Sequence, residues 1–333
     1  PVEPRALPPE SLLPAIASGL RYAFLSPLIR VALIRSAAFS IGSGAIWALM
    51  PLIARDLIGG GALVFGTLLG CFGTGAVLGA LVSTRLRDAL STEGLVSAAT
   101  FAFAVATALA AISHTLPLTG AALLLGGGAW VLALSTFNVT VQMSSSRWVV
   151  GRAIATYQSV TFGALAIGSW LWGTLAHLFT LPVALLCAAG VLLAGLLLRF
   201  VARLPSHARL DLTPSGAWAE PKVALDFDRT RGPVVVTVEY RVAPADVEGF
   251  RAAMAELRRI RQRDGARGWT LLQDIAGPEC WIERFHSSSW LDHLRHHRRV
   301  TVDDLAVEQR VRAFHRGSAP PQVRHLLLRR RDR

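Results

Sequence analysis

Six long apolar stretches between Val31 and Phe200 dominate this sequence and limit how it can fold. Each is close to the ~20 residues that an α-helix needs to cross the hydrocarbon core of a bilayer. The sequence therefore predicts an all-α membrane bundle of six transmembrane helices. The stretches are Val31–Ile53, Gly61–Thr84, Leu95–Ile112, Leu116–Val141, Ala153–Leu178 and Leu181–Phe200.

Arginines fall on alternate connections between these stretches. The connections that follow the third and fifth stretches carry no charged residue, and the one after the first holds only the neighbouring pair Arg55 and Asp56. Positively charged connections stay on the cytoplasmic side of a membrane. We therefore expect a multi-pass protein of the plasma (inner) membrane with both termini in the cytoplasm. The arginines that set this pattern are Arg30, Arg35, Arg85, Arg87, Arg147, Arg152, Arg199 and Arg203.

Composition agrees with a membrane-embedded chain. Of its 333 residues, 52% are hydrophobic, and the formal net charge is +12. In the membrane part this excess marks loops that face an anionic leaflet, so nucleic acid is not an expected partner. Cys71, Cys187 and Cys280 show neither metal-ligand spacing nor a disulfide pattern.

The first 27 residues form a predicted cytoplasmic amphipathic segment. Within it, Leu13, Ile16, Leu20 and Phe24 recur at helical spacing. This helix is too short to span a membrane. It either lies flat at the cytoplasmic interface or packs on its neighbours as an ordinary soluble helix.

Glycines at four-residue spacing occur in the second stretch. Gly66 and Gly70 form one such pair, and Gly75 and Gly79 form another, with Gly73 nearby. Small residues let helix backbones approach closely in lipid, which gives no hydrophobic drive for association. We expect the second helix to be closely packed.

The apolar pattern ends after the transmembrane domain, residues 28–204. Residues 205–231, rich in Pro, Ser, Asp and Arg, are a predicted linker. Residues 232–333 then show strand and helix patterns in the order βαββαβ, which is typical of an α+β ferredoxin-like domain. We expect this domain to be cytoplasmic.

The membrane part resembles the carboxy-terminal six-helix half of a major facilitator superfamily exporter, in its transmembrane secretion effector (enterobactin-exporter-like) branch. Two segments carry the resemblance. Ser83–Asp88 matches the charged turn between the second and third spans, and Arg147–Gln158, with Gly151-Arg152, matches the entry to the fifth span. The soluble domain resembles the cytoplasmic extension of some branch members, with an antibiotic-biosynthesis-monooxygenase-like fold. That likeness is carried by Arg258–Ala266 and Ala313–Gly317.

The resemblance implies a secondary active transporter that exports a small, hydrophobic molecule by alternating access. Such transporters have two six-helix halves, and only one is present here. The chain begins Pro1-Val2 without a methionine. We therefore expect either a fragment or a separate partner that supplies the missing amino-terminal half. No Walker loop occurs, so an ion gradient would power transport, and the centres of the spans lack charged residues and histidine. Any proton-carrying carboxylate should belong to the absent half.

Uncharged polar and aromatic residues are the candidates for substrate binding. Asn138 and Gln142 lie four residues apart and so share a helix face. The alternatives are hydrogen bonds between helices for the polar residues, and an interfacial belt or lipid contact for tryptophans such as Trp170 and Trp172. The predicted substrate-binding residues are Trp47, Asn138, Gln142, Tyr157, Gln158 and Phe162.

Four charged residues at cytoplasmic turns are candidates for a gate: Arg85, Arg87, Asp88 and Arg152. Such charges can pair with neighbouring helix ends and stabilise the outward-facing state. The alternative is that the arginines only set topology.

His293, His296 and His297 have helical metal-ligand spacing, but arginines flank them and no carboxylate or cysteine completes a site. A solvated helix face is the favoured interpretation, and no metal, cofactor or catalytic residue is predicted. Two other hypotheses concern the soluble domain. It is either a membrane-anchored small-molecule-binding or monooxygenase-like enzyme, or a module that forms a homodimer and ties two transporters together.

Overall fold

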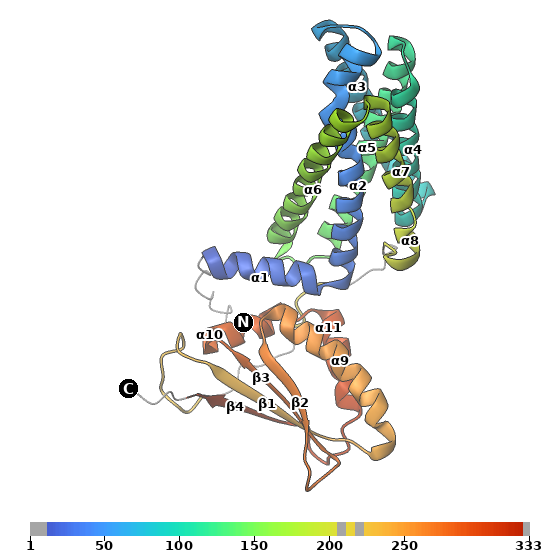
Figure 1. Cartoon of the computed structure of the whole chain (residues 1–333). Coiled ribbons are helices and arrows are strands. Elements are labelled where there is room, and N and C mark those ends of the chain that lie inside the picture. Colours follow the sequence, from blue (N-terminus) through green and yellow to red (C-terminus); the bar gives the residue numbers. More distant parts are fainter. Residues whose placement is uncertain (1–11, 205–210, 217–222, 329–333) are drawn as a thin grey trace. The chain divides into compact units, whose positions relative to one another are not determined.

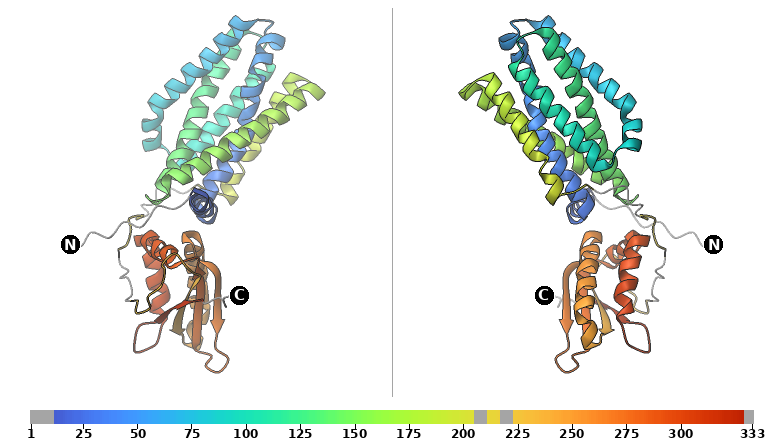
Figure 2. Two further views of the ribbon diagram at one scale, coloured as in Figure 1. Left: turned by 90° about the vertical axis from the view of Figure 1, so that its left-hand side faces the viewer. Right: turned by 90° about the vertical axis from the view of Figure 1, so that its right-hand side faces the viewer.

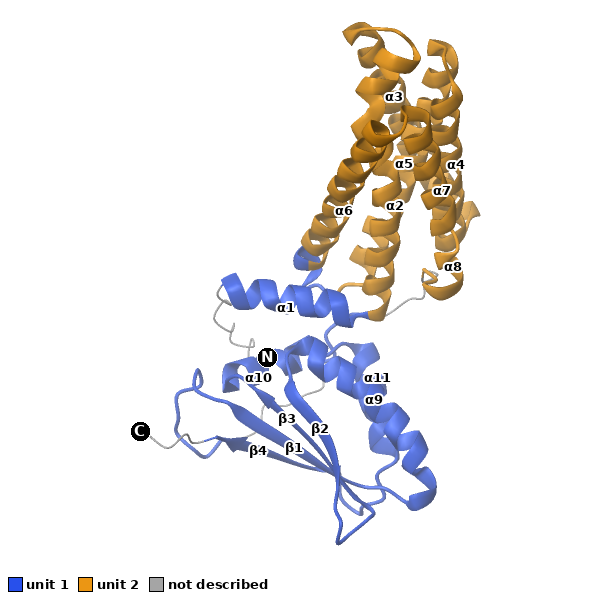
Figure 3. Ribbon diagram, in the orientation of Figure 1, with its two compact units in different colours: residues 1–26, 146–152, 210–333 blue, residues 27–145, 153–209 orange. Residues whose placement is uncertain are grey.

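The computed structural model describes residues 12–204, 211–216 and 223–328. They form two compact units, coloured separately in Figure 3. Unit 2 holds residues Pro27–Ser145 and Ala153–Arg209. Unit 1 combines Pro1–Ser26, Ser146–Arg152 and Leu210–Arg333, so the connection that leads into the fifth apolar stretch belongs with the soluble part of the chain. Each unit is described by itself.

Unit 2 is a bundle of long apolar helices (Figure 1). Among the described residues, six helices are long and apolar enough to cross a membrane, which confirms the predicted membrane bundle. The helices are α2 (Pro27–Leu52), continued by a π-helical turn at Ile53–Leu57, α3 (Ala62–Ala89), α4 (Thr92–Ile112), α5 (Leu116–Met143), α6 (Val150–Leu178), and α7 (Leu181–Gly195) with the short α8 (Leu198–Val201).

Glycines bring α3 and α5 into backbone contact. A Cβ atom at Gly75 would collide with the carbonyl of Leu124, and one at Gly127 with the carbonyl of Phe72. A Cβ atom at Gly79 would come within 2.7 Å of the backbone of Gly128. Gly73, by contrast, faces open space. Close packing therefore involves one face of α3 and not the whole helix.

Glycines also bring α2 and α6 into backbone contact. Gly44 lies against the backbone of α6 at Leu165 and Ser169, and Gly168 lies against the backbone of Ile41. Figure 2 shows the helices of this unit packed side by side. Of the six spans α2 is the most buried, whereas α3 and α6 are the least buried and leave broad apolar faces uncovered.

Unit 1 contains a four-stranded antiparallel sheet in the order β2-β3-β1-β4. This order, with helices α9, α10 and α11 against one face, is the ferredoxin-like fold that the sequence predicts. The elements are β1 (Val234–Arg241), a 3₁₀ turn (Pro244–Asp246), α9 (Val247–Asp264), β2 (Arg267–Gln273), β3 (Cys280–Ser287), α10 (Trp290–Arg299), α11 (Val302–Ala313) and β4 (Gln322–Leu327).

Alternation along β1 produces the core of this sheet. Val234, Val236, Val238 and Tyr240 are buried, whereas the residues between them are half-buried on the open face. The second helical region is two helices and not one. Thr301 separates them, since its side chain and that of Asp304 form a reciprocal capping box that starts α11.

The amphipathic helix α1 (Leu12–Leu25) also belongs to unit 1 and packs on α9. Its buried residues are small or aromatic: Ser18, Gly19, Tyr22 and Ala23. The apolar stripe expected from the sequence is instead exposed, at Leu12, Leu13, Ile16, Leu20 and Phe24. One face of α1 therefore packs on the ferredoxin-like domain, while its apolar stripe remains exposed.

Candidate functional site

The predicted gate residues on α3 differ in their surroundings. Arg87 donates a hydrogen bond from Nη2 to the hydroxyl of Ser135 on α5, at 2.9 Å. Arg85 and Asp88 are exposed, and neither makes an ion pair with the residues that the structure describes. Of these three residues, only Arg87 therefore links two helices.

A buried ion pair that the sequence interpretation missed lies in the same unit. Arg35 on α2 donates to Glu93 on α4 at 2.8 Å, and the two side chains are 3% and 9% exposed. Glu93 also accepts hydrogen bonds from the hydroxyl of Ser97 and, at 2.9 Å, from the backbone N–H of Leu204. This carboxylate therefore holds together α2, α4 and the chain after α8. The available signal was an arginine just inside the first apolar stretch and a glutamate just before the third.

Trp47 lies in an aromatic cluster formed by three helices. Its ring centroid is 5.3 Å from that of Phe72 on α3 and 5.4 Å from that of Trp130 on α5. Trp47 remains 39% exposed. It thus combines firm aromatic packing with a surface that another molecule can reach.

The other predicted substrate-binding residues are spread over α5 and α6. Tyr157 is buried and donates from its hydroxyl to the carbonyl of Leu134 at 3.0 Å. Asn138 is half-buried, while Gln142, Gln158 and Phe162 are exposed. The structure therefore ties Tyr157 to the α5 backbone and does not enclose the six residues in one cavity. An apolar groove of about 350 Å³ between α3, α4 and α5 contains none of them.

Two tryptophans of α6 have different environments. Trp172 is buried and donates from Nε1 to the carbonyl of Ile41 on α2 at 2.7 Å, so lipid contact does not describe it. Trp170 is 73% exposed and fits a lipid-facing position.

The fourth gate residue, Arg152, belongs to unit 1 and contacts α1. Its Nη1 donates to the hydroxyl of Ser18 at 2.9 Å. Its aliphatic stem fills the space beside Gly19, where a Cβ atom would come within 2.7 Å of it. Because the stem of Arg152 packs against Gly19, the start of α6 contacts α1 directly.

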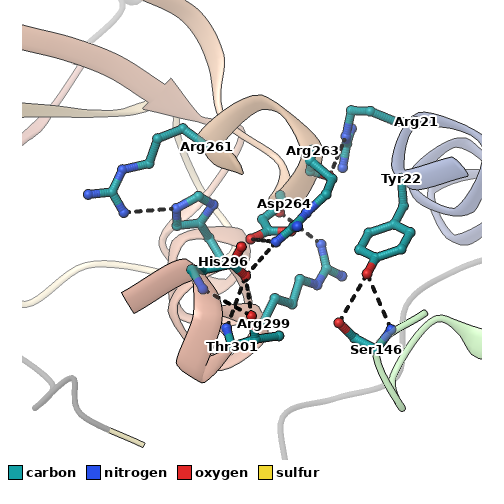
Figure 4. A network of polar contacts seen from close by, with 10 residues as sticks. Arg21, Tyr22, Ser146, Arg261, Arg263, Asp264, His296, Arg299 and Thr301 are labelled. Carbon is teal, nitrogen blue, oxygen red and sulfur yellow. Dashed lines mark hydrogen bonds and ion pairs between the residues drawn. The ribbon is translucent and has the colours of Figure 1, made fainter. Parts of the chain in front are cut away.

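Tyr22 of α1 is the centre of a second set of contacts, shown in Figure 4. Its hydroxyl lies 3.1 Å from the hydroxyl of Ser146 and accepts a hydrogen bond from the Ser146 backbone N–H at 3.2 Å. The edge of its ring meets Trp148, with centroids 5.5 Å apart. The guanidinium of Arg263 stacks on the same ring at 5.1 Å.

Charged groups of the ferredoxin-like domain complete this surface. Arg263 pairs with Asp264 at 2.9 Å and with Asp304 at 2.6 Å. Arg299 donates to the carbonyl of Asp264 and stacks on Trp148 at 4.0 Å. Burial raises the pKa of the Asp264 carboxyl to about 6, although the adjacent guanidinium of Arg263 acts in the opposite direction. We call the residues Tyr22, Ser146, Trp148, Arg152, Arg263 and Arg299 the connection surface.

The sequence analysis named Arg152 only as a gate candidate and named neither Tyr22 nor Trp148. The signal for these two was an aromatic residue directly beside an arginine, as in Arg21-Tyr22 and Arg147-Trp148.

The histidines of α10 are not on a solvated face, so that expectation was wrong. His293 and His296 are 0% and 1% exposed, because α10 turns them toward the sheet and packs their rings against aromatic neighbours. The His293 ring lies 4.9 Å from that of His325 on β4 and 4.6 Å from that of His297. Burial, with nearby positive charge, lowers the pKa of His293 to about 3 and that of His296 well below its usual value. Within the described residues, no histidine, cysteine and carboxylate cluster has metal-binding geometry.

Comparison with known proteins gives a family match and matches to three chains of solved structures. A crystal structure from Bordetella bronchiseptica, named as an antibiotic biosynthesis monooxygenase, is 22% identical, with a TM-score of 0.26. The match covers 29% of this chain and 98% of that one. No curated protein matches the chain. The profile of the transmembrane secretion effector family matches residues 1–333. Together with the six apolar helices, this match over the whole length establishes that the chain belongs to the transmembrane secretion effector family, a multi-pass membrane transport family of the major facilitator superfamily.

Proposed function

We propose that this protein exports a small hydrophobic molecule across the plasma (inner) membrane by alternating access, and that it supplies one half of the transporter. The observation that carries the proposal is the set of six apolar spans in a chain whose whole length matches a secretion effector family. The spans have no charge at their centres, which suits an apolar cargo better than an ionic one.

The cargo surface in this proposal follows the uncovered faces of α3 and α6. These are the least buried spans, and the exposed Gln158 and Phe162 belong to α6. Trp47 offers a partly exposed aromatic ring on α2. A second six-helix half would cover these faces and enclose a cavity lined by rings and amides, with Asn138, Gln142 and Tyr157 contributing from α5 and α6.

The gate in this proposal lies at the cytoplasmic ends of α3 and α6. Arg87 already holds α3 to α5 through Ser135, whereas Arg85 and Asp88 are exposed and available for charges on the other half. Arg152 has a different partner, the hydroxyl of Ser18 on α1. Both chain ends would then be cytoplasmic, in line with the arginine pattern.

For the soluble domain we propose two roles. The first is to hold the connection between α5 and α6, because Arg263 and Arg299 stack on Tyr22 and Trp148. The second is homodimerisation through the open sheet face, where Leu326 and Leu272 are 51% and 46% exposed. An exposed apolar sheet face is a common protein interface.

Transport assays with the missing half test the proposal. The chain would be co-expressed with a six-span amino-terminal half from the same family, reconstituted in liposomes, and assayed for efflux of the neutral dye Nile red under an ion gradient. Gradient-dependent efflux that needs both halves is the expected result. Equal efflux without a gradient, or from either half alone, would contradict it.

Topology is tested separately in a variant without native cysteines. Cysteines at Arg85 and His114 should be labelled from opposite sides of the membrane by an impermeant maleimide. Labelling of both from one side would contradict the transporter assignment, because the arginines would then not mark one side of the membrane.

A further inference from the structure

An apolar groove of about 350 Å³ runs along unit 2 between α3 and α4, with α5 as its floor. It forms because α3 and α4 each pack on α5 but scarcely touch each other. The residues that line it are all Gly, Ala, Val or Leu, among them Leu78, Val82, Leu86, Ala98, Ala102 and Leu132.

The groove is long and open along its side. Its lining on α3 extends over fifteen positions, from Gly75 to Leu90, which is ~22 Å of helix. One leaflet contributes about half of a ~30 Å hydrocarbon core, so the groove is at least as long as one leaflet is thick. Leu78 and Leu125 in its wall are 48% and 42% exposed, so the groove opens on the surface of the bundle. A flexible hydrocarbon chain can therefore lie along it.

The groove lies on the opposite side of α3 from the open glycines of this helix. A Cβ atom added at Gly66, Gly70 or Gly73 would meet nothing within 4 Å. Gly73 and Val82 are nine positions apart, which is two and a half helical turns, so they point in opposite directions. A second six-helix half that covers the glycine face therefore leaves the groove open to lipid.

One end of the groove adjoins a guanidinium group. Leu90 and Leu95 line this end, and both also border a smaller space that Arg87 lines. Arg87 donates from Nη2 to the hydroxyl of Ser135, and its buried Nε has no hydrogen-bond partner among the described residues. The Arg87 guanidinium is thus held beside the groove by a neutral acceptor.

The charges around this end favour an anion. Arg85 is exposed two positions from Arg87, and these two arginines outnumber the exposed Asp88. The carboxylate of Glu93 is already paired with Arg35 at 2.8 Å. Guanidinium groups form strong charge-assisted hydrogen bonds with phosphate, and basic pockets between transmembrane helices bind anionic lipid head groups. An apolar groove that ends at such a group matches the two parts of a phospholipid.

We propose that this groove binds one anionic phospholipid, with an acyl chain between α3 and α4 and the phosphate beside Arg87. In the topology proposed above, this end lies in the cytoplasmic leaflet, which carries the anionic lipids. The site is independent of the proposed export, because it uses the side of α3 that faces away from the open glycines. Its loss would leave the export proposal intact.

Native mass spectrometry of the full chain in detergent tests the proposal. The probes are dioleoyl phosphatidylglycerol and dioleoyl phosphatidylcholine, which have the same acyl chains and differ in head-group charge. One molecule of phosphatidylglycerol should bind about fivefold more tightly than phosphatidylcholine, the effect of one arginine on an anionic lipid. Equal affinities for the two lipids would overturn the proposal.

Arg87→Gln tests the phosphate contact, since glutamine keeps a donor for Ser135 but carries no charge. This variant should lose the preference for phosphatidylglycerol and bind phosphatidylcholine as the original chain does. Arg30→Gln is the matched control, because Arg30 is exposed on α2 and does not line the groove. It should keep the preference. Loss of the preference in both variants would mean attraction to positive charge in general and would contradict the site.

Ala98→Trp and Ala102→Trp test the acyl-chain contact by filling the groove from α4. Ala98 is exposed, so its replacement leaves the helix core intact. Each variant should abolish the tight binding of phosphatidylglycerol. Ala80→Trp makes the same change at an exposed position of α3 outside the groove and should leave binding unaltered. Undiminished binding in both filled variants, or an equal loss in Ala80→Trp, would show that the lipid does not occupy the groove.

Discussion

The secondary-structure elements of the two units pack against one another in different ways. In unit 2 the helices meet backbone to backbone at glycines, as at Gly127 and Gly168. In unit 1 the sheet and helices meet through large apolar side chains such as Phe250 and Phe285. Apolar surface gains nothing from leaving lipid for another helix, so close van der Waals contact must hold the membrane unit together. In water, burial itself provides the drive.

The largest effect should follow from filling a backbone contact of unit 2. Gly127→Leu places a side chain where the carbonyl of Phe72 lies, and overpacking of this kind should cost at least about 3 kcal/mol. SDS titration of the purified protein measures the loss. Gly73→Leu is the matched control, since Gly73 faces open space on the same pair of helices. A similar loss in both variants would mean that glycine contacts do not determine helix packing.

Breaking the buried ion pair of unit 2 should have an effect of similar size. Glu93→Ala leaves Arg35 buried without its carboxylate and removes the acceptor for the Leu204 N–H. We expect a destabilisation of about 3–5 kcal/mol, measured by the same titration. Asp56→Ala removes the partner of an exposed pair, Arg55 and Asp56, and should leave stability nearly unchanged because water screens such a pair.

Mild acid should destabilise unit 1 more than unit 2. His293 and His296 have lowered pKa values in the folded protein, so their contribution is complete above pH 6.5 and is lost as pH falls below it. Between pH 7.5 and 5.5 the contribution of His293 falls by about 1.3 kcal/mol. The contribution of His296 falls in the same direction. Asp264, with its pKa raised to about 6, acts in the opposite direction and offsets somewhat less than about 1 kcal/mol.

The two histidines together outweigh Asp264, so the net effect of these three groups is a loss of stability as pH falls. Hydrogen exchange of β1 amides, corrected for intrinsic pH dependence, measures it. Replacement of both histidines by phenylalanine should reduce the pH dependence, and His297 and His325, whose pKa values are also lowered by burial, contribute to the remainder. Exchange that slows as pH falls would show that Asp264 dominates.

A smaller effect is expected in the connection surface. Tyr22→Phe removes the acceptor for the Ser146 backbone N–H but keeps the ring between Arg263 and Trp148. The Ser146 amide should exchange about two- to tenfold faster. Tyr240→Phe, a loss of a hydroxyl within the sheet core, should leave that amide unchanged. If Ser146 exchanges at its original rate in Tyr22→Phe, the hydrogen bond does not hold the connection.

The smallest change in stability should come from the gate. Asp88 is exposed and makes no ion pair with the described residues of this half. Asp88→Asn should therefore leave expression and stability unaltered while changing the rate of Nile red efflux by the two-half assembly. An unaltered rate would mean that the charged turn serves topology alone.

The sequence predicts those features that depend on periodicity. Six stretches near twenty residues indicate six spans, and the alternation from Val234 to Tyr240 indicates a half-buried strand. Pairings between distant residues leave no such pattern. Arg35 and Glu93 are 58 positions apart, and Tyr22 and Ser146 are 124 apart. The prediction for the α10 histidines failed for a related reason. Their charged neighbours in the sequence suggested a solvated face, and their burial depends on ring contacts with residues that are distant in the sequence.

The candidate site is less predictable than the fold. Gln158 and Phe162 were chosen by residue type, and both side chains are exposed. Arg152 was chosen for its place at a cytoplasmic turn, but its partner is Ser18 of α1. The sequence gives the chemical type of such residues, whereas their contact partners depend on the tertiary structure.

Unit 1 is assembled from three separate parts of the chain, and this has a consequence for biosynthesis. Tyr22 and Trp148 leave the ribosome long before Arg263 and Arg299, which stack on them. Until Arg263 and Arg299 have been synthesised, the two aromatic rings lack these cations. The ferredoxin-like domain therefore completes a surface begun by α1, and a nascent chain released before that point would expose the aromatic surface to quality control.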